Sequence, residues 1–156
     1  MTKRFGNAPV EILLVEDNPG DICLIEEAFH DAGLQVKLDV ARDGEEALDF
    51  LKREGKYTSA QAPDLILLDL NLPRKDGREL LGVIKSDPTL RRIPVIVLTT
   101  SKSERDIAKS YDLHANCYII KPVGIEALTN VVRSIEHFWL RVSTLPPNAA
   151  AAGDAA

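Results

Sequence analysis

The sequence has few cysteines and no long apolar run, and both absences narrow the class of protein. The two cysteines, Cys23 and Cys117, lie far apart and outside any metal-binding spacing, so we expect buried thiols in a reducing compartment rather than a disulfide framework. No apolar run reaches the roughly 18 residues of a membrane-spanning helix. No apolar stretch follows the basic residues near the start, which argues against a signal peptide. These features predict a cytoplasmic protein that does not span a membrane.

An excess of basic residues is also missing. Lysine and arginine number 19 against 24 aspartates and glutamates, which gives a net charge of −5. Nucleic-acid-binding surfaces need clustered positive charge, so we expect no nucleic acid partner. The remaining composition, 45% apolar and 28% charged residues, is typical of a globular domain. We expect one domain over residues 10–142, between a short lead, residues 1–9, and a Pro- and Ala-rich tail, residues 143–156, that is partly disordered.

Five short apolar runs alternate with segments of helical periodicity. The expected strands cover residues 11–15, 35–40, 65–68, 94–98 and 117–120, and the expected helices cover residues 18–33, 46–53, 78–86, 103–113 and 124–141. Nearly continuous apolar strands, each followed by a helix, are typical of a parallel sheet covered on both faces. Right-handed crossovers then predict an α/β fold with a doubly wound, five-stranded parallel sheet. Asp43-Gly44 and Asp76-Gly77 are predicted to form turns.

Polar side chains stand where four of these strands end. Glu16 and Asp17 follow the first strand, Asp69 the third, Thr99 the fourth and Lys121 the fifth. Ligands of doubly wound sheets bind at the carboxyl ends of the strands, so these side chains are expected to share one site. Three carboxylates in one cleft repel one another, and a divalent cation such as Mg²⁺ relieves that repulsion through oxygen ligands.

Each of these residues also has a plainer interpretation. Asp17 and Asn18 could serve only as helix caps, and residues 101–104 could form a capping box. Asp69 could form a turn, and Lys121 could be a solvated surface charge. Taken singly, each plain interpretation is the commoner one. We favour a functional site because all these residues fall at strand ends on one side of the predicted sheet.

The combination resembles the receiver domain of two-component response regulators. The matching segments are Leu14-Val15-Glu16-Asp17-Asn18, Leu67-Leu68-Asp69-Leu70-Asn71-Leu72-Pro73 with Asp76-Gly77, Thr99-Thr100-Ser101 and Lys121-Pro122. Thr99 follows Asp69 by 30 residues, and Lys121 follows Thr99 by 22. The resemblance covers about residues 10–141 and implies a flavodoxin-like (βα)5 fold with strand order 2-1-3-4-5.

The resemblance implies that Asp69 accepts a phosphoryl group from a sensor histidine kinase. Mg²⁺ would be held by Glu16, Asp17, Asp69 and the backbone carbonyl of Asn71. The protein would then be a signalling phosphoacceptor that assists its own phosphotransfer and dephosphorylation, not an enzyme with a separate substrate.

The resemblance also assigns a switch around the phosphoryl group. Thr99 would hydrogen-bond that group, Lys121 would pair with its oxygens, and the peptide bond between Lys121 and Pro122 would be cis. Tyr118 matches the aromatic switch position, although it could equally be a half-buried strand residue. Movement of Thr99 toward the phosphoryl group would free space for Tyr118.

A narrower resemblance concerns the end of the chain. Residues 114–118 and 134–140, together with the polar insertion at residues 55–63, look like the single-domain regulators that partner bacterial phytochromes. This resemblance implies a phytochrome histidine kinase as partner. The aromatic pair Phe138 and Trp139 predicts a homodimer through the last helix.

Three other functions remain open. A Mg²⁺-dependent phosphatase of the haloacid dehalogenase type normally has a second acidic residue two positions after the nucleophile, where this chain has Asn71. A flavin or nucleotide binder would need a glycine-rich loop after the first strand, where Glu16 and Asp17 stand. A phosphate sink would keep the same residues, whereas the presence of all the expected site residues counts against a degenerate receiver that acts only as a scaffold.

Overall fold

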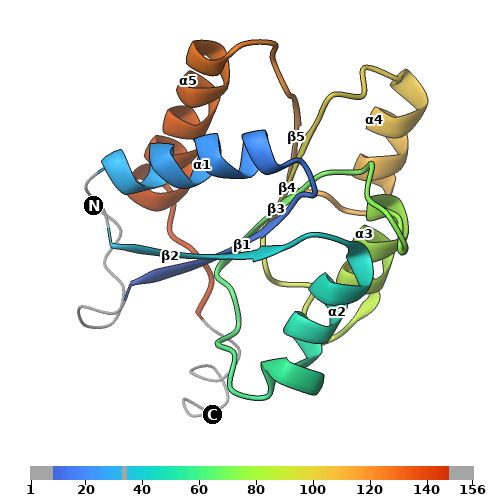
Figure 1. Ribbon diagram of the computed structural model, residues 1–156. Coiled ribbons are helices and arrows are strands. Elements are labelled where there is room, and N and C mark those ends of the chain that lie inside the picture. The colour runs from blue at the N-terminus through green and yellow to red at the C-terminus, as the bar shows by residue number, and fades with distance from the viewer. Residues whose placement is uncertain (1–8, 33–34, 148–156) are drawn as a thin grey trace.

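The predicted sheet is present. The computed structural model describes residues 9–32 and 35–147 (Figure 1). The strands are β1 Val10–Val15, β2 Val36–Ala41, β3 Leu65–Leu68, β4 Val95–Thr99 and β5 Cys117–Ile120. All pairings are parallel and the strand order is β2-β1-β3-β4-β5, as predicted.

Helices cover both faces of this sheet. They are α1 Pro19–Asp31, α2 Gly44–Lys52, α3 Gly77–Ser86, α4 Glu104–Asp112 and α5 Ile125–Ile135. Figure 1 shows α1 and α5 together on one face, with α2 and α3 on the other. Successive strand residues divide between two apolar clusters, since Ile12 and Leu14 pack toward α1 and α5 whereas Leu13 and Val15 pack toward α2 and α3. The sheet is therefore buried on both faces, as its nearly continuous apolar strands predict.

Helix caps explain why the chain turns sharply after the strands. Asn18 caps α1, accepting from the N–H of Asp21 at 3.0 Å, and Ser103 caps α4. Asp43 and Asp76 cap α2 and α3, so the predicted Asp-Gly turns are helix starts.

The glycines after these last two caps permit close backbone contact. A Cβ atom at Gly77 would collide with the carbonyl of Asp69 and with Leu70, and one at Gly44 would collide with Lys75. Helices α2 and α3 thus begin directly against the loop that follows β3, and that loop carries Asp69.

The last helix differs from its prediction. The expected helix over residues 124–141 is α-helical only in α5 and continues as a π-helical segment, Glu136–Val142. Arg141 donates to buried Glu136 at 2.6 Å and to the carbonyl of Ala32 at 3.2 Å, so this segment is tied to the end of α1. Beyond it, Leu145 is buried in the α1–α5 cluster. The expected tail therefore starts packed on the fold, and residues 148–156 lie outside the described residues.

The cysteine prediction was wrong for Cys23. Ile22 and Ile25 occupy the buried face of α1, and the helical period places Cys23 on the exposed face. Cys117 is half-buried in β5, and burial raises the pKa of its thiol. In the described part of the chain, no helix has the length and apolar character needed to cross a membrane.

Candidate functional site

The residues predicted from four strand ends meet at one edge of the sheet. Glu16 and Asp17 follow β1, Asp69 follows β3, Thr99 ends β4 and Lys121 follows β5. The backbone aligns these ends: the N–H of Asp69 donates to the carbonyl of Val15 at 3.0 Å, and that of Lys121 donates to the carbonyl of Thr99 at 2.6 Å.

Lys121 lies at the centre of this site and is almost completely buried. Its Nζ donates to Glu16 Oε2 at 2.7 Å, to Asp21 Oδ2 at 2.9 Å and to Asp69 Oδ2 at 3.3 Å. An ammonium has three donors, and all three are used. Burial alone would lower the pKa of Lys121, but the hydrogen bonds to Glu16 and Asp21 and the charge of Asp69 raise it above its ordinary value. The side chain is therefore a fixed positive charge.

The second carboxylate oxygen of Glu16 contacts the backbone that leads into α1. Its Oε1 accepts hydrogen bonds from the N–H groups of Asp17 and Asn18, both at 3.1 Å. Burial and the nearby charge of Asp69 raise the pKa of Glu16, despite the opposing contact with Lys121. The site is thus short of positive charge.

The carboxylates are close enough to share a cation. Oxygen atoms of Glu16, Asp17 and Asp69 lie within 4.8 Å of one another, and Asp17 is exposed at the entrance. With Asp21, the site holds four carboxylates and one ammonium, a formal charge of −3, and three of the carboxylates contact the ammonium directly. Oxygen donors with an uncompensated negative charge fit a hard divalent cation.

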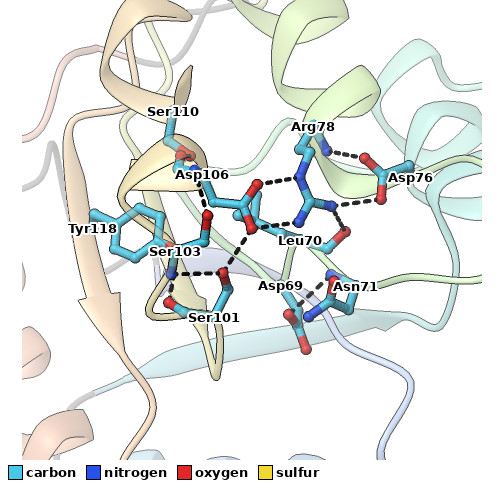
Figure 2. A network of polar contacts seen from close by, with 10 residues as sticks. All are labelled: Asp69, Leu70, Asn71, Asp76, Arg78, Ser101, Ser103, Asp106, Ser110 and Tyr118. Carbon is cyan, nitrogen blue, oxygen red and sulfur yellow. Dashed lines mark hydrogen bonds and ion pairs between the residues drawn. The ribbon is translucent and has the colours of Figure 1, made fainter. Parts of the chain in front are cut away.

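Asn71 lies in the loop after β3, as expected for a residue beside the site. Its N–H donates to Asp69 Oδ1 at 3.2 Å, which orients the carboxylate (Figure 2). The role of its carbonyl as a metal ligand stays a prediction.

The two proposed switch residues occupy distinct environments. Thr99 is fully buried, and its Oγ1 makes no hydrogen bond within the described part of the chain. Tyr118 is half-buried, and its hydroxyl donates to the carbonyl of Ser101 at 2.9 Å. Thr99 therefore has an unused hydroxyl, whereas the hydroxyl of Tyr118 is tied to the loop after β4.

The cis peptide bond predicted between Lys121 and Pro122 was wrong. No peptide bond among the described residues is cis. Lys121 reaches its three carboxylates with the bond to Pro122 in the trans form, which is the more stable isomer of bonds preceding proline.

A second ionic network, which sequence reasoning missed, joins the two loops beside Asp69. Arg78 at the start of α3 donates to both carboxylate oxygens of Asp106, at 2.8 and 2.7 Å, and to Asp76 at 2.9 Å (Figure 2). Asp106 also accepts from the hydroxyl of Ser101 at 2.6 Å. The hydrogen bonds from Arg78 and Ser101 lower the pKa of Asp106 to about 2. The only sequence signal was the position of Asp106, three residues after the Ser103 cap.

Asp21 was also missed. It lies in the first turn of α1, where an acidic residue is an ordinary helix-start feature, and only the fold brings Lys121 to it. Its distance to Lys121, 2.9 Å, is shorter than that of Asp69.

The aromatic pair near the end of the chain is only partly exposed. Phe138 is 51% exposed, whereas Trp139 packs partly against the α1–α5 cluster. Their rings meet edge to face, with centroids 5.3 Å apart. Val142, one turn further, is also exposed.

Comparison with known proteins agrees with this geometry. The family model of the response regulator receiver domain matches residues 12–133. Response regulator Rcp1 of Synechocystis sp. is 49% identical over 141 residues, which cover 90% of this chain and 96% of Rcp1. The probable methanogenesis regulatory protein FilR2 of Methanothrix harundinacea is 46% identical over 133 residues, 85% of this chain and 84% of FilR2.

Solved structures show the same similarity. The phosphorylated cyanobacterial phytochrome response regulator RcpA is 56% identical with a TM-score of 0.88, over 90% of this chain and 100% of RcpA. The Mn²⁺-bound form of Rcp1 is 49% identical with a TM-score of 0.87, over 89% of this chain and 100% of Rcp1. The acidic cluster of this chain and the Mn²⁺-bound form of Rcp1 fit the divalent-metal binding that is typical of receiver domains. The chain belongs to the family of response regulator receiver domains, and it is a signalling protein of the Rcp1 type.

Proposed function

We propose that this receiver accepts a phosphoryl group from a sensor histidine kinase on Asp69, with Mg²⁺ held by Glu16, Asp17, Asp69 and the Asn71 carbonyl. The observation that supports this most strongly is the placement of Asp69. Its Oδ2 lies 3.3 Å from the buried ammonium of Lys121, and its Oδ1 accepts from the N–H of Asn71. The carboxylate is therefore oriented toward the one ammonium that, among the described residues, contacts this acidic cluster.

The geometry suits phosphoryl transfer. An oxygen of Asp69 attacks phosphorus, the P–N bond of the donor phosphohistidine breaks, and the imidazole nitrogen leaves with the bonding pair. Lys121 compensates the charge that spreads over the phosphoryl oxygens. Mg²⁺, when bound, supplies the rest of that compensation. Asn71 keeps the attacking carboxylate from rotating.

Thr99 and Tyr118 are proposed to transmit the change. The new group adds a charge of about −2 and several acceptor oxygens. Thr99 ends the strand next to β3 and has an unused hydroxyl that can donate to these oxygens. Because Ser101 lies two residues beyond Thr99, movement of this loop disturbs the bond between Ser101 and Tyr118.

The donor is proposed to be a phytochrome histidine kinase in the cytoplasm. RcpA, at 56% identity, is named a phytochrome response regulator. FilR2, at 46% identity, is named a methanogenesis regulator, so a donor other than a phytochrome is the competing assignment. The test compares phosphotransfer from a phytochrome kinase and from a non-phytochrome kinase, each under red and far-red light. Equal transfer from both kinases under both lights would contradict the phytochrome assignment.

Output is proposed to pass through protein contacts, including a homodimer through the end of the last helix, rather than through nucleic acid or membrane. Phe138 and Val142 form an exposed apolar pair on the π-helical segment, beside Trp139. Sedimentation should show a concentration-dependent dimer that Phe138→Asp weakens. Val123→Asp, at an exposed residue of the loop before α5, is the matched control. A monomer at all concentrations would exclude the dimer.

Two other functions are distinguished by turnover and output. A Mg²⁺ phosphatase would hydrolyse small phosphate esters repeatedly, whereas a phosphoacceptor is labelled once per chain and has no separate substrate. A phosphate sink would be labelled without a change in its protein contacts. A scaffold would keep the same protein contacts whether or not it is labelled. We therefore expect stoichiometric labelling, no ester turnover and a phosphorylation-dependent association.

The central test is labelling by acetyl phosphate or by a kinase. Asp69→Asn keeps the shape of the side chain but removes the nucleophile, so labelling should vanish. Asp112→Asn, at an exposed carboxylate ending α4, is the control and should be labelled normally. Undiminished labelling of Asp69→Asn would disprove the proposal.

A further inference from the structure

A fourth carboxylate, Asp21, contacts the ammonium that the proposed reaction requires. Asp21 lies in the first turn of α1, held there by the bond from its N–H to the Asn18 cap. Its Oδ2 accepts from Lys121 Nζ at 2.9 Å, and its side chain is 25% exposed. Glu16 and Asp69, the other partners of Lys121, are both members of the carboxylate cluster near the entrance, whereas Asp21 is not.

We infer that Asp21 is a positioning residue, which holds Lys121 and restrains the entry of anionic phosphoryl donors. The inference deepens the proposed function and rests on it. It concerns how strongly the pocket accepts a phosphoryl group, not which residue receives it.

Competition for Lys121 is the physical basis. All three donors of its ammonium are occupied, so a phosphoryl oxygen on Asp69 must displace one partner or share a donor with it. A metal at the cluster would compensate the charges of Glu16 and Asp69. Asp21 would then be the one partner of Lys121 still competing with the phosphoryl oxygens for its charge.

The net negative charge of the site also opposes the binding of an anionic phosphoryl donor. The four carboxylates and one ammonium carry a formal charge of −3, so even a bound divalent cation leaves the pocket negative. Removing the charge of Asp21 brings the metal-bound pocket to neutrality. A neutral pocket repels an anionic donor less and attracts a cation less.

Asp21→Asn therefore has opposite effects on two ligands. The Asn side chain keeps the size and one acceptor oxygen but not the charge. We expect the dissociation constant of Mg²⁺, measured by calorimetry, to rise about three- to tenfold. At saturating Mg²⁺ the KM for acetyl phosphate should fall by a similar factor, with kcat changed less than about twofold. Beryllofluoride, a non-covalent phosphoryl mimic, should also bind more tightly.

Two further variants separate this role of Asp21 from a general effect of removing one negative charge from α1. Asp21→Glu keeps the charge and should restore both constants to near their original values. Glu26→Gln removes the same charge from the exposed face of α1, where no contact with Lys121 exists, and should change neither constant by more than about twofold.

The outcomes are exclusive. A rise in the Mg²⁺ constant together with a fall in KM and tighter beryllofluoride binding supports the inference. Weaker binding of both ligands indicates a merely structural role and overturns it, as does an unchanged KM. Labelling of Asp69→Asn would instead disprove the proposed function, whatever the Asp21 variants do.

Discussion

Asp69 belongs to one ionic network, its neighbour Leu70 accepts from Arg78 of a second network, and the charge balance of the two networks differs. In the first network, Lys121 is the one cation in contact with three carboxylates, and its side chain is almost completely buried. Arg78 lies between Asp76 and Asp106, holds Asp106 through two parallel hydrogen bonds, and is partly exposed. The first network lacks positive charge and is suited to receive a cation and a phosphoryl group. The second satisfies its own groups and is suited to hold two loops together.

The contrast also appears in the pKa values. Burial and the charge of Asp69 raise the pKa of Glu16, so the negative form is costly there. Hydrogen bonds from Arg78 and Ser101 lower the pKa of Asp106 to about 2, so the negative form is favoured. Shifted pKa values occur both at functional sites and in structural ion pairs, and the physical cause tells the two apart here: burial and a like charge act on Glu16, whereas paired hydrogen bonds hold Asp106.

The largest effect is expected from Lys121→Gln, which removes the only cation of the first network. The rate of labelling by acetyl phosphate should fall about 100-fold, because the phosphoryl oxygens lose their protein-borne positive charge. Mg²⁺ should bind more tightly, opposite to Asp21→Asn, since the pocket becomes more negative.

Lys102→Gln provides the control for this change. Lys102 is an exposed residue of the loop after β4, and its replacement should leave the rate within about twofold. If Lys121→Gln is labelled as fast as the original protein, Lys121 is a packing residue and the contrast between the two networks is lost.

A smaller effect is expected in the second network. Arg78→Gln and Asp106→Asn should each lower the free energy of unfolding by about 1–3 kcal/mol, because each leaves a charged, partly buried partner without its paired hydrogen bonds. The double variant should cost much less than the sum of the two. Urea unfolding measures all three.

Arg74→Gln is the matched control for this cycle. Arg74 is an exposed arginine of the loop after β3, and its contacts with Asp43 and Glu45 are 3.7 and 4.0 Å long. Its replacement should cost less than about 0.5 kcal/mol. Additive losses in the Arg78 and Asp106 cycle would show that the two residues do not act as a pair.

The sequence predicts the first network far better than the second. Glu16, Asp69, Thr99 and Lys121 each end a strand or follow one, and parallel strands place their carboxyl ends together. Arg78 and Asp106 lie 28 residues apart on two helices, and nothing in their local sequence indicates that the helices approach each other. Periodicity locates elements, but contacts between elements depend on the packed fold.

The errors have several origins. Cys23 is exposed because of the helical phase of α1, which the apolar count alone does not reveal. Asp43-Gly44 and Asp76-Gly77 were predicted as turns, but each aspartate caps a helix, and each glycine lies against the loop after β3. The π-helical segment contains an ion pair between Glu136 and Arg141, and its apolar pattern is the same as that of an α-helix.

The smallest expected effect is the part of the pH dependence of stability that comes from the second network. The pKa of Asp106 is about 2 in the folded protein against an ordinary 3.8, so the folded state binds fewer protons than the unfolded state between these values. The stability that Asp106 contributes is thus fully present above about pH 5 and is lost as the pH falls through the folded pKa of about 2. Urea unfolding from pH 5 to pH 2.5 should show a shallower loss for Asp106→Asn than for the original protein. Because the hydrogen bond from Arg78 is the largest cause of the shift, Arg78→Gln should flatten the same profile, whereas Arg74→Gln should leave it unchanged. Parallel profiles for all four proteins would show that the Arg78–Asp106 pair does not set this titration.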